Sequence, residues 1–312
     1  MSEKKILAGT YTDTGSKGIY SFTENNGIIR DPNVFAETGS PKYISVSSGL
    51  VASIGKGSNG SGGASVFDDK GHMLSERNWE ATTSCWIGWH EGNVYTANYH
   101  TGFVSRLKYS EGELKVDKTV DIRDNAGCHQ VLFHGNQILV PCLFMDRIMI
   151  FDGDLEFLGF ISFPAGTGPR HGVFSEDKSV LYLISELSNE LFVMDTEDWS
   201  VRSVMPVLMD GRMNIRGGAA VRLCEAKKKL YVSTRRADVI SVIDLEKMKT
   251  VQEVYSGGKG PRDFILCDHS LIAANRYSDS IVCFELKEDG TIGAETSRIS
   301  VPQPVSLAVL ES

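Results

Sequence analysis

Hydrophobic and polar residues recur along this chain with a period of two, which is the pattern of half-buried β-strands. Segments such as ISVSSGLVASIG, ISVIDLEKMKTVQEVY and SIVCFELKEDGTIG combine this alternation with β-branched residues and with turns rich in glycine, aspartate and asparagine. Few stretches have the 3.6-residue period of an amphipathic helix. The pattern therefore predicts a chain that consists almost entirely of β-structure.

The strand-like segments form a repeat, and each copy begins with a short opening segment. The openers contain proline in SPKYISV (Pro41), GPRHGVF (Pro169), GPRDFIL (Pro261) and QPVSLAV (Pro304), whereas GCHQVLF and GGAAVRL occupy the same place without it. Pro261 and Pro304 are 43 residues apart, and Pro41 and Pro169 are 128 apart. These distances correspond to about one and about three repeats of roughly 40–45 residues, the length of a propeller blade.

A second segment follows the openers at a nearly constant distance, for example LYLISELSNELFVM, and seven copies of it can be aligned. The last opener lies at the C-terminus, and the strands that would complete its sheet lie at the N-terminus. We therefore expect an all-β, seven-bladed β-propeller that is closed by pairing N- and C-terminal strands in one blade. Length alone would also allow two domains, but the regular period favours a single domain over residues 1–312.

Residues that break the repeat gather at one position of the expected blades. In the usual strand order, the innermost strand of a blade begins, and the second strand ends, at the same mouth of the propeller. The residues at this position are Lys42, His129, Arg170, His171 and Arg262 in the openers, and Tyr11, Lys56, Tyr99, Leu143, Glu186, Arg235 and Arg276 in the second segments. Clustered arginines suit bidentate binding of phosphate or carboxylate.

Each of these residues also has a structural explanation. An arginine at the end of a strand usually makes a surface ion pair, and Glu186 could simply pair with Arg235. Independent surface charges have no reason to coincide at one mouth, however, so the shared position favours a common ligand.

Composition and charge restrict the class of ligand. The chain has 41% hydrophobic and 23% charged residues, as an ordinary soluble protein does, and its formal net charge is −8. Nucleic acid is therefore a poor partner, because phosphate backbones bind to basic faces. No apolar run is long enough for a membrane span, and the first residues lack the pattern of a signal peptide.

The cysteines and histidines give no sign of a metal site. The six cysteines lie far apart without a C-x-x-C pair, which argues against a zinc ribbon or a disulfide scaffold and favours the cytoplasm. No cluster of histidine, cysteine and carboxylate residues has the spacing of metal ligands. We expect neither a metal nor an organic cofactor.

Motifs in a constant order over most of the chain carry a family resemblance: GTYT…GIYSF, ANYHTGFVS, GCHQVLF, VPCLFMDRI, GTGPRHGVF, SELSNELFV, GGKGPRDF and ANRYSDSIVCF. In these motifs the chain resembles the bacterial 6-phosphogluconolactonases of the seven-bladed propeller type, which are related to the fungal carboxymuconate cycloisomerase. The resemblance implies that the active-site positions of the family fall on His129, Arg170, Glu186 and Arg235. The chain departs from the family pattern at Gly127, where many relatives have a second histidine, and at Thr234, which replaces an asparagine.

The resemblance implies a hydrolase that opens a sugar δ-lactone, most simply 6-phosphogluconolactone, in the pentose phosphate pathway. Glu186 or His129 would be the general base that deprotonates the attacking water, and Arg170 or Arg235 would stabilise the oxyanion or bind the anionic substrate. The expected substrate-binding residues, of which all but Tyr99 are assigned to the phosphate, are His171, Arg262, Arg276, Lys42 and Tyr99.

Two other functions fit the same pattern. One is a lactonizing cycloisomerase or another sugar lactonase that uses the same ring of residues. The other is a non-catalytic propeller that binds a partner across its mouth. A binding platform of that kind should present exposed aromatic residues, and Tyr11, Tyr99 and Tyr277 keep this alternative open.

Overall fold

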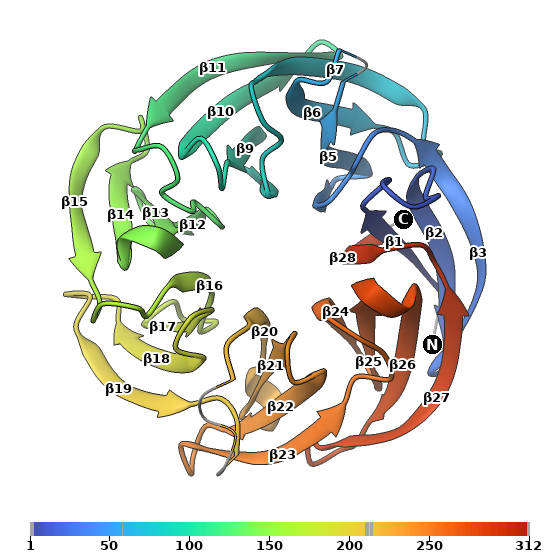
Figure 1. Ribbon diagram of the computed structural model, residues 1–312, viewed down its shortest axis with the longest axis vertical. Helices are drawn as coiled ribbons and strands as arrows, with labels where there is room; N and C mark the ends of the chain where they lie inside the picture. Colours follow the sequence, from blue (N-terminus) through green and yellow to red (C-terminus); the bar gives the residue numbers. More distant parts are fainter. Residues whose placement is uncertain (1–2, 58, 210–211, 213–214, 311–312) are drawn as a thin grey trace.

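The computed structural model describes residues 3–57, 59–209, 212 and 215–310. Its strands form seven antiparallel sheets of four strands each, arranged in a ring (Figure 1). The predicted all-β, seven-bladed β-propeller is therefore confirmed. Within the described ranges, no helix is long and apolar enough to cross a membrane.

The strands of each blade run from the innermost to the outermost in one order. Blade 1 consists of β28 (Pro304–Leu310), β1 (Lys4–Thr10), β2 (Gly18–Asn25) and β3 (Ile28–Glu37). Blade 2 consists of β4 (Ile44–Ser47), β5 (Leu50–Lys56), β6 (Gly62–Phe67) and β7 (Met73–Glu80), and blade 3 of β8 (Trp86–His90), β9 (Asn93–Ala97), β10 (Phe103–Ser110) and β11 (Glu113–Asp121). Blade 4 consists of β12 (Leu132–His134), β13 (Gln137–Cys142), β14 (Arg147–Asp152) and β15 (Phe157–Ser162), and blade 5 of β16 (Pro169–Phe174), β17 (Val180–Ser185), β18 (Glu190–Asp195) and β19 (Val201–Pro206). Blade 6 consists of β20 (Gly218–Cys224), β21 (Lys229–Thr234), β22 (Val239–Asp244) and β23 (Lys249–Tyr255), and blade 7 of β24 (Pro261–Cys267), β25 (Ser270–Asn275), β26 (Ser280–Leu286) and β27 (Ile292–Ser300). Short 3₁₀ turns interrupt three of the connections: η1 (Leu143–Met145), η2 (Glu225–Lys227) and η3 (Arg276–Ser278).

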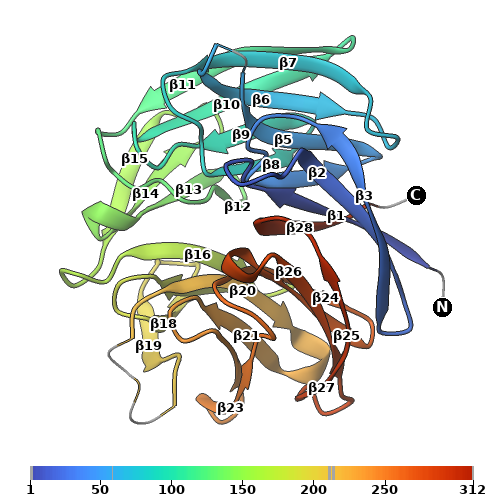
Figure 2. The same cartoon turned by 45° about the vertical axis from the view of Figure 1, so that its right-hand side comes forward.

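The ring closes through blade 1, as the sequence predicted. The C-terminal strand β28 is innermost and pairs antiparallel with β1, from Lys5 opposite Leu310 to Gly9 opposite Ser306. The two strands lie side by side in Figures 1 and 2. Closure of this kind joins the two ends of the chain in one sheet, so that the ring leaves only short, protected sheet edges.

The hydrophobic core lies between neighbouring blades. An inner strand such as β25 is covered on both faces by the adjacent sheets, and all six of its residues are buried. An outer strand such as β11 has water on one side, and its residues alternate between more and less exposed positions. Inner strands therefore have nearly continuous apolar sequences, whereas outer strands keep the strict alternation of a half-buried strand.

Backbone contacts fix which residues reach the mouth. In blade 5, Pro169 pairs with Ser185, and the next residue, Glu186, donates its backbone N–H to the carbonyl of Gly168 (2.8 Å). Blades 6 and 7 repeat the contact, from Arg235 to Gly217 (2.9 Å) and from Arg276 to Gly260 (3.1 Å). Gly168 has a φ of +63°, and a Cβ there would lie 2.6 Å from the side chain of Leu187, so glycine is required.

Candidate active site

A cavity of about 210 Å³ opens at this mouth, and all seven blades contribute to its lining. The lining residues are Tyr11, Lys42, Thr83, Cys85, Tyr99, His100, His129, Glu186, Arg235 and Arg262. Six of the nine residues predicted for the site are among them: Lys42, Tyr99, His129, Glu186, Arg235 and Arg262. The register of the repeat therefore brings residues from distant parts of the sequence to one place.

The other three predicted residues do not line the cavity. Arg170 and His171 are buried beneath it, with 1% and 5% of their surface exposed. Arg276 lies to one side, on η3, where its guanidinium carbon is 3.7 Å from the centroid of the Tyr11 ring. A direct contact of Arg170 or His171 with a ligand in the cavity is not supported by these positions.

One part of the cavity, which we call the carboxylate end, consists of Glu186, Arg235 and His129. Arg170 Nε donates to Glu186 Oε2 (2.8 Å) from below, and Arg235 Nη2 lies 2.6 Å from Glu186 Oε1. Burial opposes ionisation of Glu186, but the charges of the two arginines and the hydrogen bond from Arg235 outweigh it and lower the pKa of this carboxyl. Glu186 is therefore a carboxylate at neutral pH, and both of its oxygens are oriented.

Arg170 is a support of this carboxylate. Its Nη1 donates to the backbone carbonyl of Ala219 in the neighbouring blade, and burial lowers its pKa to about 10. The guanidinium thus remains charged at neutral pH. Because its hydrogen bonds go to Glu186 and to the backbone, Arg170 acts on the position of Glu186.

His129 and His171 form a buried pair. His129 Nδ1 lies 3.1 Å from His171 Nε2, and His129 is only 4% exposed. Burial and the nearby charge of Arg170 hold the pKa of both imidazoles well below the usual histidine value. Both rings are therefore neutral at physiological pH.

The opposite part of the cavity, which we call the cationic end, consists of Tyr11, Lys42, Arg262 and the adjacent Arg276. Lys42 Nζ donates to Thr83 Oγ1 (2.5 Å), and Arg276 Nε donates to Gln303 Oε1 (3.1 Å). Within the described part of the chain, no carboxylate oxygen lies within 4.0 Å of a side-chain nitrogen of Lys42, Arg262 or Arg276. This end therefore carries three positive charges without a direct counterion.

The cations also act on their neighbours. Burial raises the pKa of Tyr11, but the charges of Arg262, Lys42 and Arg276 outweigh it and lower that pKa overall. Burial and the charge of Arg262 lower the pKa of Lys42. A group of cations that stabilises a phenolate in this way would stabilise a bound anion by the same interaction.

Three lining residues, Thr83, Cys85 and His100, were not predicted from the sequence. Thr83 and Cys85 precede β8, whose opener SCWIGWH has neither the proline nor the leading glycine of the other openers. A signal was present, because Cys85 precedes Cys128 by 43 residues, which is one repeat. Cys85 donates its thiol to the backbone carbonyl of Cys128 (3.2 Å), and burial raises its pKa to about 11, so the sulfur is a neutral thiol.

The segment that carries Thr83 and Cys85 is held by Glu80, which is 2% exposed. Its carboxylate accepts hydrogen bonds from the backbone N–H of Ser84 (3.0 Å) and from Asn98 Nδ2 (3.1 Å). Burial raises the pKa of Glu80, and these neutral donors offset only part of the effect. Among the described residues, no group of three or more histidine, cysteine or carboxylate side chains is placed to hold a metal ion.

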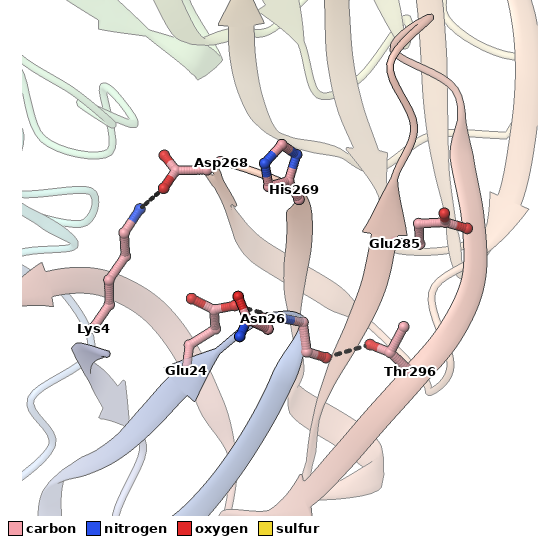
Figure 3. Close-up of a pocket in the computed structure, with 8 residues that line it drawn as sticks. Lys4, Glu24, Asn26, Asp268, His269, Glu285 and Thr296 are labelled. Carbon is pink, nitrogen blue, oxygen red and sulfur yellow. Dashed lines mark hydrogen bonds and ion pairs between the residues drawn. The ribbon is translucent and has the colours of Figure 1, made fainter. Parts of the chain in front are cut away.

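A second and larger hollow, of about 380 Å³, lies between blades 1 and 7 (Figure 3). It is at the other end of the blades, since Lys4 begins β1 whereas Tyr11 follows its end. Several of its polar groups bind one another: Lys4 Nζ lies 3.0 Å from Asp268 Oδ2, and Glu24 Oε1 accepts from the backbone N–H of Gly27 (2.8 Å). Volume therefore does not distinguish the candidate active site; the convergence of residues from all seven blades, with charged groups from blades 2, 5, 6 and 7, does.

Known proteins resemble the chain over nearly its whole length. Residues 5–309 match the model of the family described as lactonase, 7-bladed beta-propeller. The chain is 28% identical to the 6-phosphogluconolactonase of Bacillus subtilis over 97% of each chain. Two solved structures share the fold: a protein from Lactobacillus plantarum (TM-score 0.89, 24% identity, 99% of this chain and 100% of that one) and the periplasmic gluconolactonase of Pseudomonas aeruginosa (TM-score 0.86, 22% identity, 99% of each). The chain thus belongs to the family of lactonases with a seven-bladed β-propeller.

Proposed function

We propose that this protein hydrolyses 6-phosphoglucono-δ-lactone to 6-phosphogluconate, an intermediate of the pentose phosphate pathway. The observation that carries the proposal is the pairing of two unlike ends in one cavity of about 210 Å³. One end holds an ionised carboxylate beside an arginine. The other holds Lys42 and Arg262, with Arg276 beside them, and none of these three cations has a direct carboxylate partner in the described part of the chain. Family membership supports a lactone hydrolase, and the relative from Bacillus subtilis is named a 6-phosphogluconolactonase.

The cationic end suits the phosphate of such a substrate. Arg262 and Lys42 line the cavity, and Arg276 lies against Tyr11 beside them. Guanidinium groups bind phosphate bidentately, and the ammonium group adds a point charge. We assign the phosphate to these three residues and exclude His171 from it, because His171 is buried behind His129.

The carboxylate end suits the reaction at the lactone carbonyl. A water molecule must lose a proton as its oxygen attacks C1, and the carbonyl oxygen then becomes an oxyanion. A general base of the type offered by Glu186 or His129 contributes roughly 10²–10⁴-fold, and one oxyanion donor such as Arg235 contributes roughly 10²–10³-fold. Arg170 positions Glu186, because it contacts that carboxylate from below the cavity.

The test is to measure the loss of freshly generated 6-phosphoglucono-δ-lactone with purified, chelator-treated protein. We expect a rate well above spontaneous hydrolysis, and a lower kcat/KM for glucono-δ-lactone, which lacks the phosphate. Glu285→Gln, in the hollow of Figure 3, is the matched control and should keep full activity. Equal kcat/KM for the two lactones would favour another sugar lactonase. Activity on neither lactone, with turnover of a muconate, would favour the cycloisomerase.

We place this reaction in the cytoplasm. The six cysteines are free thiols, and the sulfurs of Cys128 and Cys142 lie 3.7 Å apart without a bond. A reducing compartment suits this arrangement. The structural relative from Pseudomonas aeruginosa is named a periplasmic protein, so fractionation of the native cell is the measurement that decides the location.

A further inference from the structure

The hydrogen bonds of the two buried histidines bear on which residue is the general base. His171 Nε2 lies 3.1 Å from His129 Nδ1 and also 3.2 Å from the backbone carbonyl oxygen of His129. A carbonyl oxygen can only accept a hydrogen bond, so His171 Nε2 must carry the hydrogen. The same N–H faces His129 Nδ1, and that atom must therefore offer its lone pair.

This contact fixes the tautomer of His129. A neutral imidazole carries one hydrogen, and if Nδ1 has the lone pair, the hydrogen is on Nε2. His129 lines the cavity, and none of the hydrogen bonds among the described residues uses its Nε2. The nitrogen that remains for a ligand is therefore an N–H donor.

Packing holds both rings in this arrangement. The ring of Tyr43 stands edge-on to His171, with centroids 6.2 Å apart at 82°, and Tyr99 stands edge-on to His129, at 5.8 Å and 82°. The charges of Arg170 and Arg262 face the pair and oppose a second proton on either ring. A hydrogen on His129 Nδ1 would also point at the N–H of His171.

We infer that His171 is a positioning residue that holds His129 in the Nε2–H form, so that His129 donates to the oxyanion and Glu186 is the general base. The inference rests on the proposed function. His129 cannot accept the proton of water at Nε2, which already carries one, and its lone pair at Nδ1 is occupied by His171. Glu186 is ionised and lines the same cavity.

The reaction balances without the transfer of a proton to or from His129. The oxygen of water bonds to C1 of the lactone, and its proton passes to Glu186. The carbonyl oxygen becomes an oxyanion, which accepts hydrogen bonds from His129 Nε2–H and Arg235. When the bond between C1 and the ring oxygen breaks, the leaving oxygen takes the proton back from Glu186. A neutral histidine acts as an electrophile in this way when its surroundings prevent a second proton.

The direct test is spectroscopic and needs no substrate. In the full chain labelled with ¹⁵N-histidine, we expect His129 Nε2 to give the shift of a protonated nitrogen and Nδ1 that of a nitrogen with a free lone pair. The signals are assigned by their loss in His129→Gln. The opposite tautomer would overturn the inference even if the protein proves to be a lactonase, and the tautomer can be read even if it does not.

Variants of His171 connect the tautomer to catalysis. His171→Phe removes the donor, so we expect a mixture of the two tautomers of His129. The kcat should fall, but by less than the ~10²–10³-fold that complete loss of an oxyanion donor costs, and KM should change little. His171→Gln can donate an amide N–H to the same atoms and should restore both the tautomer and most of kcat. If Phe and Gln lower kcat equally while both proteins melt like the native one, His171 has only a structural role.

Variants of His129 separate a donor from a base. His129→Gln keeps an N–H donor but has no basic nitrogen, whereas His129→Ala has neither. If His129 is a donor, the Gln variant should keep at least about tenfold more kcat than the Ala variant, since one oxyanion donor is worth roughly 10²–10³-fold. If His129 were the base, both variants should lose activity alike, by roughly 10²–10⁴-fold.

Discussion

At the carboxylate end of the cavity, Glu186 is held between Arg170 and Arg235, whereas at the cationic end Lys42, Arg262 and Arg276 surround Tyr11. The first group is neutralised in part by its own contacts, and its atoms are held by hydrogen bonds of 2.8 and 2.6 Å. The second group has no carboxylate among its direct partners in the described residues, and its cations lie 3.7–5.9 Å from the Tyr11 ring.

The difference is physically informative because paired and unpaired buried charges respond differently to a ligand. A paired charge already has its partner and is held in a fixed geometry, and fixed geometry lowers the barrier of a reaction. An unpaired cluster of cations gains its partner only when an anion binds, so it contributes mainly to the affinity for an anionic ligand. We therefore expect substitutions at the carboxylate end to lower kcat, and substitutions at the cationic end to raise KM.

Glu186→Gln should have the largest effect on catalysis. The amide cannot accept a proton from water, so kcat for 6-phosphoglucono-δ-lactone should fall by roughly 10²–10⁴-fold, the scale of a general base. KM should change far less, because Lys42 and Arg262 remain in place. Steady-state kinetics per mole of folded protein, with Glu285→Gln as the control, measures the effects on kcat and on KM separately. A rise in KM with unchanged kcat would reverse the assignment of the two ends.

Arg262→Ala should have the next largest effect, and on the other kinetic constant. Loss of a charge-assisted hydrogen bond worth about 1.5–3 kcal/mol corresponds to a rise in KM of roughly 10–150-fold. The rise should be specific to the phosphorylated lactone, since glucono-δ-lactone has no phosphate to lose. A similar rise in KM for both lactones would mean that Arg262 binds the sugar or the oxyanion.

The comparison also shows what the sequence could and could not predict. The period, the prolines and the mouth positions predicted the seven blades, the closing strand and the gathering of six site residues. Arg170 and Arg262 occupy equivalent places in GPRH and GPRD, and nothing in those motifs distinguishes their roles. The structure separates them, because the position that is Glu186 in blade 5 is Arg276 in blade 7.

That exchange explains the depth of each arginine. Glu186 attracts Arg170, which folds onto it and is almost completely buried, whereas Arg262 has an arginine in place of that carboxylate and lines the cavity. The direction of a long side chain thus depends on a neighbour that is distant along the chain, and the repeat alone does not report it. His171, which the sequence assigned to the phosphate end, is also oriented by a distant residue, since its partner is His129, 42 residues earlier.

The paired end should contribute to stability with a definite pH dependence. Glu186→Gln leaves Arg170 buried without its countercharge, which costs about 3–5 kcal/mol for a broken buried pair at neutral pH. Because the folded-state pKa of Glu186 is lowered from 4.5, the stabilisation is complete above that value and is lost as the pH falls through the lowered pKa. In denaturant unfolding, the difference in the free energy of unfolding between the native protein and Glu186→Gln should become smaller in acid. A difference that is constant with pH would mean that the ion pair is not its source.

Glu80 provides the smallest and sharpest contrast, because it is a buried carboxylate at the same mouth with neutral donors in place of arginines. Burial raises its folded-state pKa above 4.5, so the folded protein binds the proton more tightly than the unfolded chain does. The resulting stabilisation is present below pH 4.5 and is lost as the pH rises through the raised pKa. Relative to Glu80→Gln, the native protein should therefore become less stable with rising pH, opposite in sign to the Glu186 pair and smaller, since no buried cation loses its partner. For each variant, Glu186→Gln and Glu80→Gln, the difference in stability from the native protein can be followed against pH. If both differences change with pH in the same direction, the arginines are not what distinguishes Glu186 from an ordinary buried carboxylate.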